Sequence, residues 1–225
     1  DGAKIGPQQS FFGISSSTAG DVNGDGYSDA VIGAYQATGG QEGEGRIYVY
    51  HGTSTGLSAN PNWIAESNQP YASLGKSVST AGDVNGDGYG DIIASAVYYS
   101  NGQSNEGAVF GWFGSSTGLG ANGSPGNADW MVESNEDTAY FGECVALAGD
   151  VNGDGYSDVL VSSNQRISNG TEREGKVSLY TGSASGLATQ SGWSNESGQD
   201  NAYYGYSAGS AGDVNGAGYS DGLLG

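Results

Sequence analysis

The chain has 225 residues, of which 36 % are apolar, so it is long enough for one substantial domain or two small ones with a modest core. Its formal charge of −19 disfavours a nucleic acid or an anionic membrane surface as a partner, because both are negatively charged. One cysteine excludes an intrachain disulfide, and no apolar run reaches the ~18 residues of a membrane span, which predicts no membrane insertion.

The first 66 residues contain four short β-type runs separated by Gly, Asn and Ser turns. FFGISSSTAG ends at residue 20, and DAVIGA follows an acidic loop. In the third run, EGRIYVYHG, Ile47 and Val49 alternate with Tyr48 and Tyr50, which is typical of a strand with two different faces. The fourth run, NWIAES, contains Trp63. No stretch shows a helical period with caps.

The same four runs return along the chain in the same order. The acidic loop that separates the first run from the second begins at Asp21, Asp83, Asp150 and Asp213, with spacings of 62, 67 and 63 residues. Runs and loops that return in the same order at a nearly constant spacing indicate an internal repeat. We place the repeats at about 11–66, 73–133 and 140–196, with a partial copy at 204–225.

Four strands in about 60 residues, repeated, are typical of the blades of a β-propeller. The sequence therefore predicts an all-β fold, a β-propeller of four-stranded antiparallel blades, with residues 1–225 as one propeller segment. Three complete units and two further strands make fourteen strands, or three and a half blades. Because half a ring has open edges, we expect the rest of the propeller to come from the same longer chain or from a second copy.

The acidic loop has the composition of a calcium site. In DVNGDGYSD, residues 21–29, oxygen-bearing side chains stand at positions 1, 3, 5 and 9, and glycines stand at positions 4 and 6, where a tight turn needs positive φ. Such oxygen ligands suit Ca²⁺, with Mg²⁺ second. An EF-hand would need a glutamate at position 12, where Ile32 stands, so Asp29 must close the site in a strand–loop–strand hairpin. A plain Asn/Gly/Asp turn is the structural alternative.

The pattern FG…AGDVNGDGYSD…VIGA resembles the FG-GAP repeat of integrin α-subunit propellers and their bacterial relatives. The FG position holds Phe12-Gly13, Leu74-Gly75, Phe141-Gly142 and Tyr204-Gly205. The GAP-like end is Gly33-Ala34, with Ala94-Ser95 and Ser162-Ser163 as departures. The resemblance implies a seven-bladed propeller, of which this chain would be half. It also implies Ca²⁺ in hairpin loops on one face and ligands on the opposite face.

The expected metal ligands are side-chain oxygens at positions 1, 3, 5 and 9 and the backbone carbonyl of the tyrosine at position 7. The first three loops supply Asp21, Asn23, Asp25, Tyr27, Asp29, Asp83, Asn85, Asp87, Tyr89, Asp91, Asp150, Asn152, Asp154, Tyr156 and Asp158. The fourth supplies only Asp213, Asn215, Tyr219 and Asp221, because Ala217 replaces the position-5 aspartate. We therefore expect three strong calcium sites and a fourth that is weak or empty.

Other candidate chemistry is sparse. Glu66, Glu133 and Glu196 recur in each unit after a tryptophan, and repetition favours a role in the blade over a catalytic pair, which is needed only once. The tryptophans Trp63, Trp130 and Trp193 are interpreted as blade-packing residues, with sugar platforms as the alternative. The single His51 and the single Cys144, expected in a buried strand, suggest no nucleophile–base arrangement.

The sequence predicts a non-enzymatic, calcium-stabilised adhesion or protein-binding module. Calcium loops of extracellular modules bind with dissociation constants of about 10⁻⁴–10⁻³ M, which favours a secreted or cell-surface location for a protein with an extracellular protein or glycan ligand. A carbohydrate-binding lectin, which predicts equivalent sites between blades, and a propeller attached to a secreted hydrolase are the alternatives.

Overall fold

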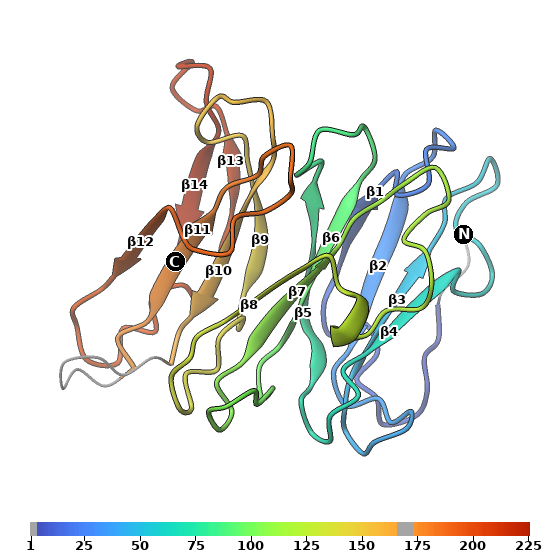
Figure 1. Cartoon of the computed structure of the whole chain (residues 1–225), viewed down its shortest axis with the longest axis horizontal. Coiled ribbons are helices and arrows are strands. Elements are labelled where there is room, and N and C mark those ends of the chain that lie inside the picture. Colours follow the sequence, from blue (N-terminus) through green and yellow to red (C-terminus); the bar gives the residue numbers. More distant parts are fainter. Residues whose placement is uncertain (1–3, 166–172) are drawn as a thin grey trace.

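The computed structural model describes residues 4–165 and 173–225, which form fourteen strands in four antiparallel sheets (Figure 1). Strands follow one another across each sheet in chain order, as in propeller blades. The first blade contains β1 (Ser16–Gly20), β2 (Asp29–Ala34), β3 (Arg46–Tyr50) and β4 (Trp63–Glu66). The second contains β5 (Leu74–Gly82), β6 (Asp91–Ala96), β7 (Ala108–Trp112) and β8 (Trp130–Glu133). The third contains β9 (Val145–Gly149), β10 (Asp158–Ser163), β11 (Lys176–Tyr180) and β12 (Trp193–Glu196), and the last sheet pairs β13 (Ala208–Gly212) with β14 (Asp221–Leu224).

The predicted fold class is therefore confirmed, including the two-stranded last unit. Helical structure in the described residues is limited to one short 3₁₀ turn, Pro125–Asn127, in the β7–β8 loop. Accordingly, no helix within residues 4–165 and 173–225 has the length and apolar character to span a bilayer. The number of blades in the closed ring stays a prediction.

The first strands of neighbouring blades contact one another, so β1, β5, β9 and β13 form the inner row of the assembly. A bulge near the end of β1 leaves Gly20 with a φ of 75° directly before the acidic loop. The same irregularity recurs in the other three sheets. Because a bulge re-aims the chain that follows it, each acidic loop leaves its blade in the same direction.

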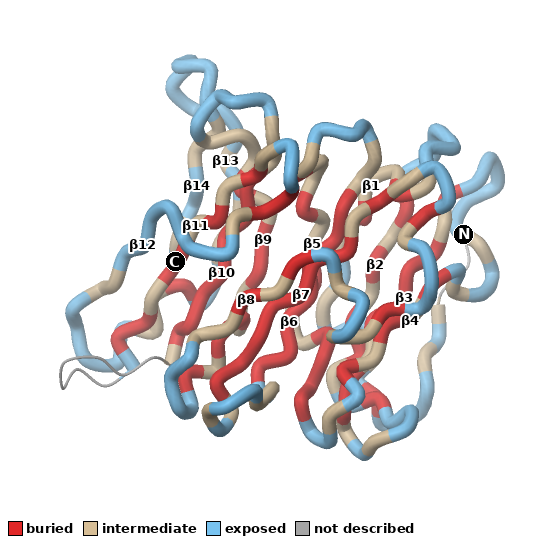
Figure 2. Tube along the Cα trace, in the orientation of Figure 1, coloured by how far each residue is buried: buried red, intermediate tan, exposed pale blue. Residues whose placement is uncertain are grey.

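The two largest core clusters each join residues of two neighbouring blades. Figure 2 shows that the buried residues follow the strands of the sheets, while the loops at both ends are exposed. Trp63 of the first blade is buried and donates its indole N–H to the carbonyl of Ala121 in the second blade, at 2.7 Å. Trp130 repeats this contact with Ala188 of the third blade, at 2.9 Å. The packing role predicted for these tryptophans is confirmed for two of them. Trp193 is 44 % exposed, so this packing is not seen for the third tryptophan.

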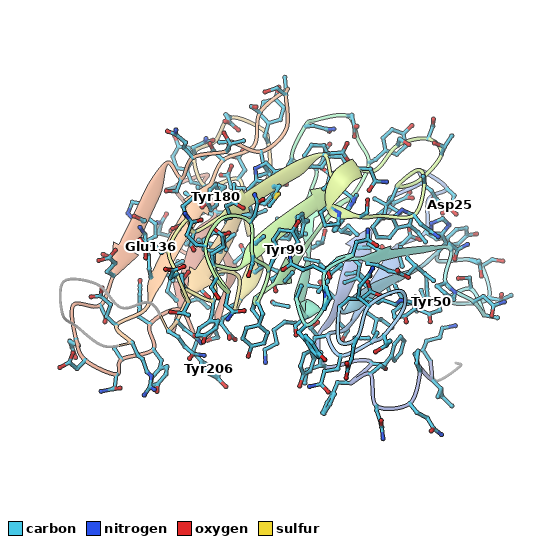
Figure 3. The ribbon with its side chains drawn as sticks, turned by 60° about the horizontal axis from the view of Figure 1, so that its bottom comes forward. Asp25, Tyr50, Tyr99, Glu136, Tyr180 and Tyr206 are labelled. Carbon is cyan, nitrogen blue, oxygen red and sulfur yellow. The ribbon has the colours of Figure 1, made fainter. Side chains whose placement is uncertain are left out.

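The loops divide between two ends of the molecule. The four acidic loops, which join the first strand of each blade to the second, lie along the top of Figure 1. The β2–β3 and β6–β7 loops, with the segments that enter the next blade, lie at the opposite end. Asp25 therefore marks the first end, and Tyr206, just before β13, marks the other (Figure 3).

Candidate metal centres

Each acidic loop is wound around the side chain of its first aspartate. Asp21 accepts three backbone N–H bonds, from Gly24, Asp25 and Gly26, at 2.7, 3.1 and 2.7 Å. Asn23 Oδ1 accepts the N–H of Asp25, and the Asn23 amide donates to Asp25 Oδ2 at 3.1 Å. The sequence folds this way because short Asp and Asn side chains readily bond to the backbone a few residues ahead.

The second and third loops repeat this geometry. Asp83 and Asp150 each accept three N–H bonds at 2.6–3.1 Å from their own loops. In the fourth loop Asp213 still accepts bonds from Ala217 and Gly218, at 2.9 and 2.8 Å. These bonds lower the pKa of Asp213, led by the one from Gly218. The hairpin therefore forms without a position-5 carboxylate, and the change at Ala217 alters the donor set rather than the fold.

The position-9 aspartate differs from the others because it is buried. Asp29, Asp91 and Asp158 are 2 %, 0 % and 0 % exposed. Asp91 accepts N–H bonds from Val84 at the start of its loop and from Gly114 in the β7–β8 loop, both at 2.8 Å. Burial raises the pKa of Asp91 to about 7 and also raises the pKa of the other two carboxyls. No described lysine or arginine forms an ion pair with these three, so a bound cation would offset the cost of burying their charge.

The carboxylates are gathered in each loop but do not form a closed cage. Within residues 4–165 and 173–225, no three His, Cys, Asp or Glu side chains converge closely enough to hold a metal ion as they stand. Their oxygens face the amides of their own loops instead. A carboxylate has about four lone-pair sites, so these bonds leave acceptor capacity for a cation. The donor set fits Ca²⁺, which takes carboxylate, amide and carbonyl oxygens in flexible arrangements.

Comparison with known proteins identifies the repeat that contains these loops. The FG-GAP repeat family model matches residues 12–50, 74–112 and 141–180, and each match contains one acidic loop between its first two strands. The chain is an FG-GAP repeat protein. The fourth loop, which carries Ala217, lies outside these three matches.

The relatives of this FG-GAP repeat protein include integrin alpha subunits. Integrin alpha-5 of Xenopus laevis is 31 % identical over 68 % of the chain, and integrin alpha-4 of the same species is 30 % identical over 72 %. Integrin alpha-PS2 of Drosophila melanogaster is 40 % identical over 41 % of the chain. The aligned parts make up 15 %, 15 % and 7 % of those proteins, so the chain spans a small part of each.

The FG-GAP loops contact one another in sequence. The Asp21 carbonyl accepts the N–H of Gly90 in the next loop at 2.8 Å, and the later pairs of loops repeat this bond. The ring of Tyr89 lies against Gly24, where an added Cβ would approach it to 2.5 Å, and φ is +72°. Tyr156 and Tyr219 take the same place against the loops before them. The tyrosine ring at position 7 of each later loop therefore packs on the loop before it.

Tyr89→Ala is expected to lower the free energy of unfolding by about 1–2 kcal/mol, because a half-buried ring loses its contact with Gly24. The backbone carbonyl of residue 89 is retained, so its own loop keeps that candidate ligand. Urea unfolding monitored by tryptophan fluorescence measures the change. Amide hydrogen exchange should increase at Gly24 in the preceding loop.

Tyr27→Ala is the matched control for this prediction. Tyr27 occupies the same register, is 44 % exposed and has no preceding loop among the described residues to pack on. Its replacement should change the free energy of unfolding by less than about 0.5 kcal/mol. Equal losses in the two variants would contradict the packing role of the ring.

The repeated glutamates belong to the blades, as predicted. Glu66 pairs with Arg46 and Glu196 pairs with Lys176, each across the last two strands of a blade. Glu133 accepts bonds from the Asn101 amide, at 3.3 and 3.0 Å. None of these contacts resembles a catalytic pair.

The two singular residues have minor roles. His51 lies directly after β3, and its Nδ1 is 3.1 Å from the amide nitrogen of Asn23, so it supports the first loop. Cys144 was expected inside a buried strand, but it precedes β9 and is only half-buried. Sequence reasoning missed the buried Glu44 and Glu106, which accept the backbone amides of the β2–β3 and β6–β7 loops. Their signal was the repeated Glu-Gly pair before the third strand of each blade.

Proposed function

We propose that the chain is part of a calcium-stabilised extracellular propeller that binds a macromolecular partner and has no catalytic activity. The observation that carries the proposal is the threefold repetition of a loop whose buried position-9 carboxylate lacks an ion pair with any described lysine or arginine. The similarity to integrin alpha subunits supports the adhesive role and a secreted or cell-surface location. The partner would be an extracellular protein or its glycan.

Each loop would hold one ion through side chains at positions 1, 3, 5 and 9 and the carbonyl at position 7. In the first loop these residues are Asp21, Asn23, Asp25, Asp29 and Tyr27, and the second and third loops supply the equivalent sets. Calcium supplies two positive charges and accepts oxygen ligands in flexible geometry. The chain's part is to gather the carboxylates by winding each loop on its own amides and to fix the hairpin.

Ala217→Asp is expected to raise the number of calcium ions bound per chain from three to four. The fourth loop already has the position-5 amide bonds of the intact loops, since Ala217 donates to Asp213 and Asn215 at 2.9 and 2.7 Å. The substitution restores the missing carboxylate in a loop that is already wound. Native mass spectrometry in millimolar calcium counts the ions, and the mass under denaturing conditions gives the chain length.

Asp154→Ala is the converse variant and should lower the count from three to two. Mg²⁺ at the same concentration should leave fewer ions bound, because it keeps more of its water. A count of zero in the unmodified protein would contradict the calcium assignment. Retained calcium with no binding to immobilised extracellular-matrix proteins would limit the loops to a stabilising role and contradict the adhesive one.

A further inference from the structure

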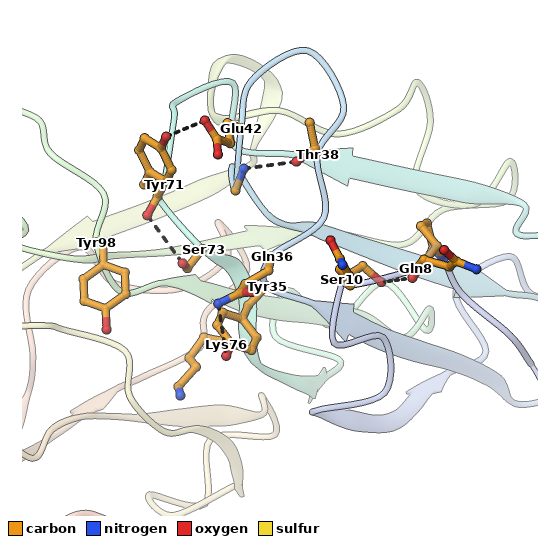
Figure 4. A pocket seen from close by; sticks show the side chains of 13 residues that line it. Gln8, Ser10, Tyr35, Gln36, Thr38, Glu42, Tyr71, Ser73, Lys76 and Tyr98 are labelled. Atoms are coloured by element: carbon orange, nitrogen blue, oxygen red, sulfur yellow. Dashed lines mark hydrogen bonds between the residues drawn. The ribbon is translucent and has the colours of Figure 1, made fainter.

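A cavity lies between the first two blades, at the end opposite the acidic loops (Figure 4). Its volume is about 630 Å³, within the ~300–1,000 Å³ typical of small-ligand sites. Three segments line it: residues 7–10 before β1, the β2–β3 loop, and the entry to the second blade, with Tyr98 after β6. The proposed calcium sites therefore contribute nothing to this cavity.

Three tyrosine rings border the cavity. Tyr71 is 59 % exposed and Tyr98 is 41 % exposed, so both present ring surface that no other part of the described structure covers. The third, Tyr35, packs against the ring of Phe11 with centroids 5.2 Å apart. Exposed rings on a polar background provide flat apolar faces for a ligand.

The charges in the cavity favour a neutral ligand. The Lys76 ammonium lies 5.1 Å from the centre of the Tyr35 ring, so the aromatic site for a cation is already occupied. The Tyr71 hydroxyl donates to Glu42, which fixes one carboxylate at the rim. Lysine would repel a cationic ligand and glutamate would repel an anionic one. Together they leave a site without net charge.

The remaining polar groups include both donors and acceptors. The side-chain amides of Gln8 and Gln9 are exposed and have no hydrogen-bond partner among the described residues. The Gln36 amide donates to the Tyr35 hydroxyl at 3.5 Å, a weak bond that a ligand could replace. A side-chain amide donates hydrogen bonds through its NH₂ group and accepts them through its oxygen. A hydroxyl group also does both, so these amides suit a ligand rich in hydroxyl groups.

An extended peptide has no strand edge to join here. The backbone of the blade-entry segment is already paired, since the Tyr71 N–H donates to the Glu42 carbonyl at 2.8 Å and the Ser73 N–H to the Gly43 carbonyl at 3.3 Å. The positive φ values of Tyr71 and Ser73, 61° and 63°, recur at the same register in the third unit, so they belong to the loop design. Peptides that add a strand require unpaired edge amides, and these are occupied.

The residues at the places that line this cavity differ at the next pair of blades. There the Tyr98 ring meets Tyr140 edge to face, with centroids 5.4 Å apart. Glu143 stands at the register of Lys76, directly after the FG glycine. Among the described residues, the second pair of blades therefore does not carry the combination of tyrosine ring and lysine found at the first pair.

We propose that this cavity binds a short neutral oligosaccharide, whose ring faces pack on Tyr71 and Tyr98 and whose hydroxyls bond to Gln8 and Gln9. The inference rests on the proposed extracellular binding function and names the ligand class of its partner. The same stacking on tyrosine and the same hydroxyl bonds to glutamine would recognise the sugar whether it belongs to a glycoprotein or to a polysaccharide.

The test is a panel of immobilised neutral oligosaccharides ending in glucose, galactose, mannose or N-acetylglucosamine, probed with the protein in millimolar calcium. We expect at least one to bind with a dissociation constant below about 1 mM, measured by titration calorimetry. Tyr71→Ala and Tyr98→Ala should each weaken binding at least about tenfold. Gln8→Ala, at an exposed position, should weaken it less and tests the polar contacts without removing a ring.

Tyr206→Ala is the matched control, because Tyr206 is 74 % exposed, follows an FG glycine and lies outside the cavity. It should leave the affinity unchanged. The proposal is overturned if no neutral oligosaccharide binds, if binding survives both tyrosine variants, or if those variants abolish binding to a deglycosylated protein partner instead. Stabilisation by calcium is measured on the same samples. If calcium still stabilises a protein that binds no sugar, the sugar proposal fails while the proposed metal sites are retained.

Discussion

Removal of calcium is expected to lower the midpoint of thermal unfolding by roughly 10 °C. A loop with a dissociation constant of about 10⁻⁴ M contributes ~1.4 kcal/mol in about 1 mM calcium, so three loops contribute about 4 kcal/mol. For a domain of this size each 1 kcal/mol moves the midpoint by about 2–4 °C. The physical source is the group of three carboxylates in each nine-residue loop, whose mutual repulsion a divalent cation offsets.

Scanning calorimetry with calcium or with EGTA at constant ionic strength measures this shift. The control is the triple variant Asp25→Ala/Asp87→Ala/Asp154→Ala, which removes the exposed position-5 carboxylates from the three intact loops. The fourth loop shows that the hairpin forms with alanine there, so the variant should fold. Its midpoint should respond to calcium far less than that of the unmodified protein. An equal response in both proteins would place the stabilising ions elsewhere.

Much of the fold follows from sequence period. The alternation of Ile47 and Val49 with Tyr48 and Tyr50, returning at a fixed spacing, predicts strands and blades because side chains in a strand point to alternate faces. All fourteen predicted strands are present in the described residues. Trp193 shows the limit of the argument. Its residue type and register match Trp63, yet its exposure depends on a neighbouring blade, which no local pattern contains.

The candidate site was predictable in part. The alternate-position oxygens of Asp21, Asn23 and Asp25 identify the loop, because ligand type and glycine spacing are local properties. Their role as calcium ligands stays a prediction. The contact of Tyr89 with Gly24 was not predictable, since it joins residues 65 positions apart through the packing of two blades. The cavity at the opposite end was missed for the same reason, because Gln8, Tyr35 and Tyr98 line one cavity only after the blades assemble.

Asp91→Ala is expected to lower the free energy of unfolding by about 3–5 kcal/mol even in the presence of a calcium chelator. The Asp91 carboxylate accepts two buried N–H bonds, from Val84 and Gly114, and so ties the acidic loop to the β7–β8 loop. Alanine would leave two buried donors unpaired, at about 1–3 kcal/mol each, and would open a small cavity. Urea unfolding in EGTA measures the loss without any contribution from bound calcium.

The matched control is Asp87→Ala in the same loop. Asp87 accepts bonds from the Tyr89 N–H and the Asn85 amide, at 3.0 and 2.9 Å, but it is exposed and water can replace it. In EGTA this variant should lose less than about 1 kcal/mol. Equal losses for the two variants would show that the buried position-9 carboxylate has no structural role apart from metal binding.

Repeating both measurements in millimolar calcium separates the two roles of Asp91. Each substitution removes one candidate ligand from the second loop, so both variants should lose that loop's share of the calcium stabilisation. The difference between Asp91→Ala and Asp87→Ala should persist, because it originates in the bonds to Val84 and Gly114 rather than in the ion. A difference that appears only with calcium would instead assign Asp91 to the metal alone. A persistent difference would mean that one buried carboxylate joins two loops of its blade, and a loss of calcium stabilisation in both variants would show its second role at the candidate ion site.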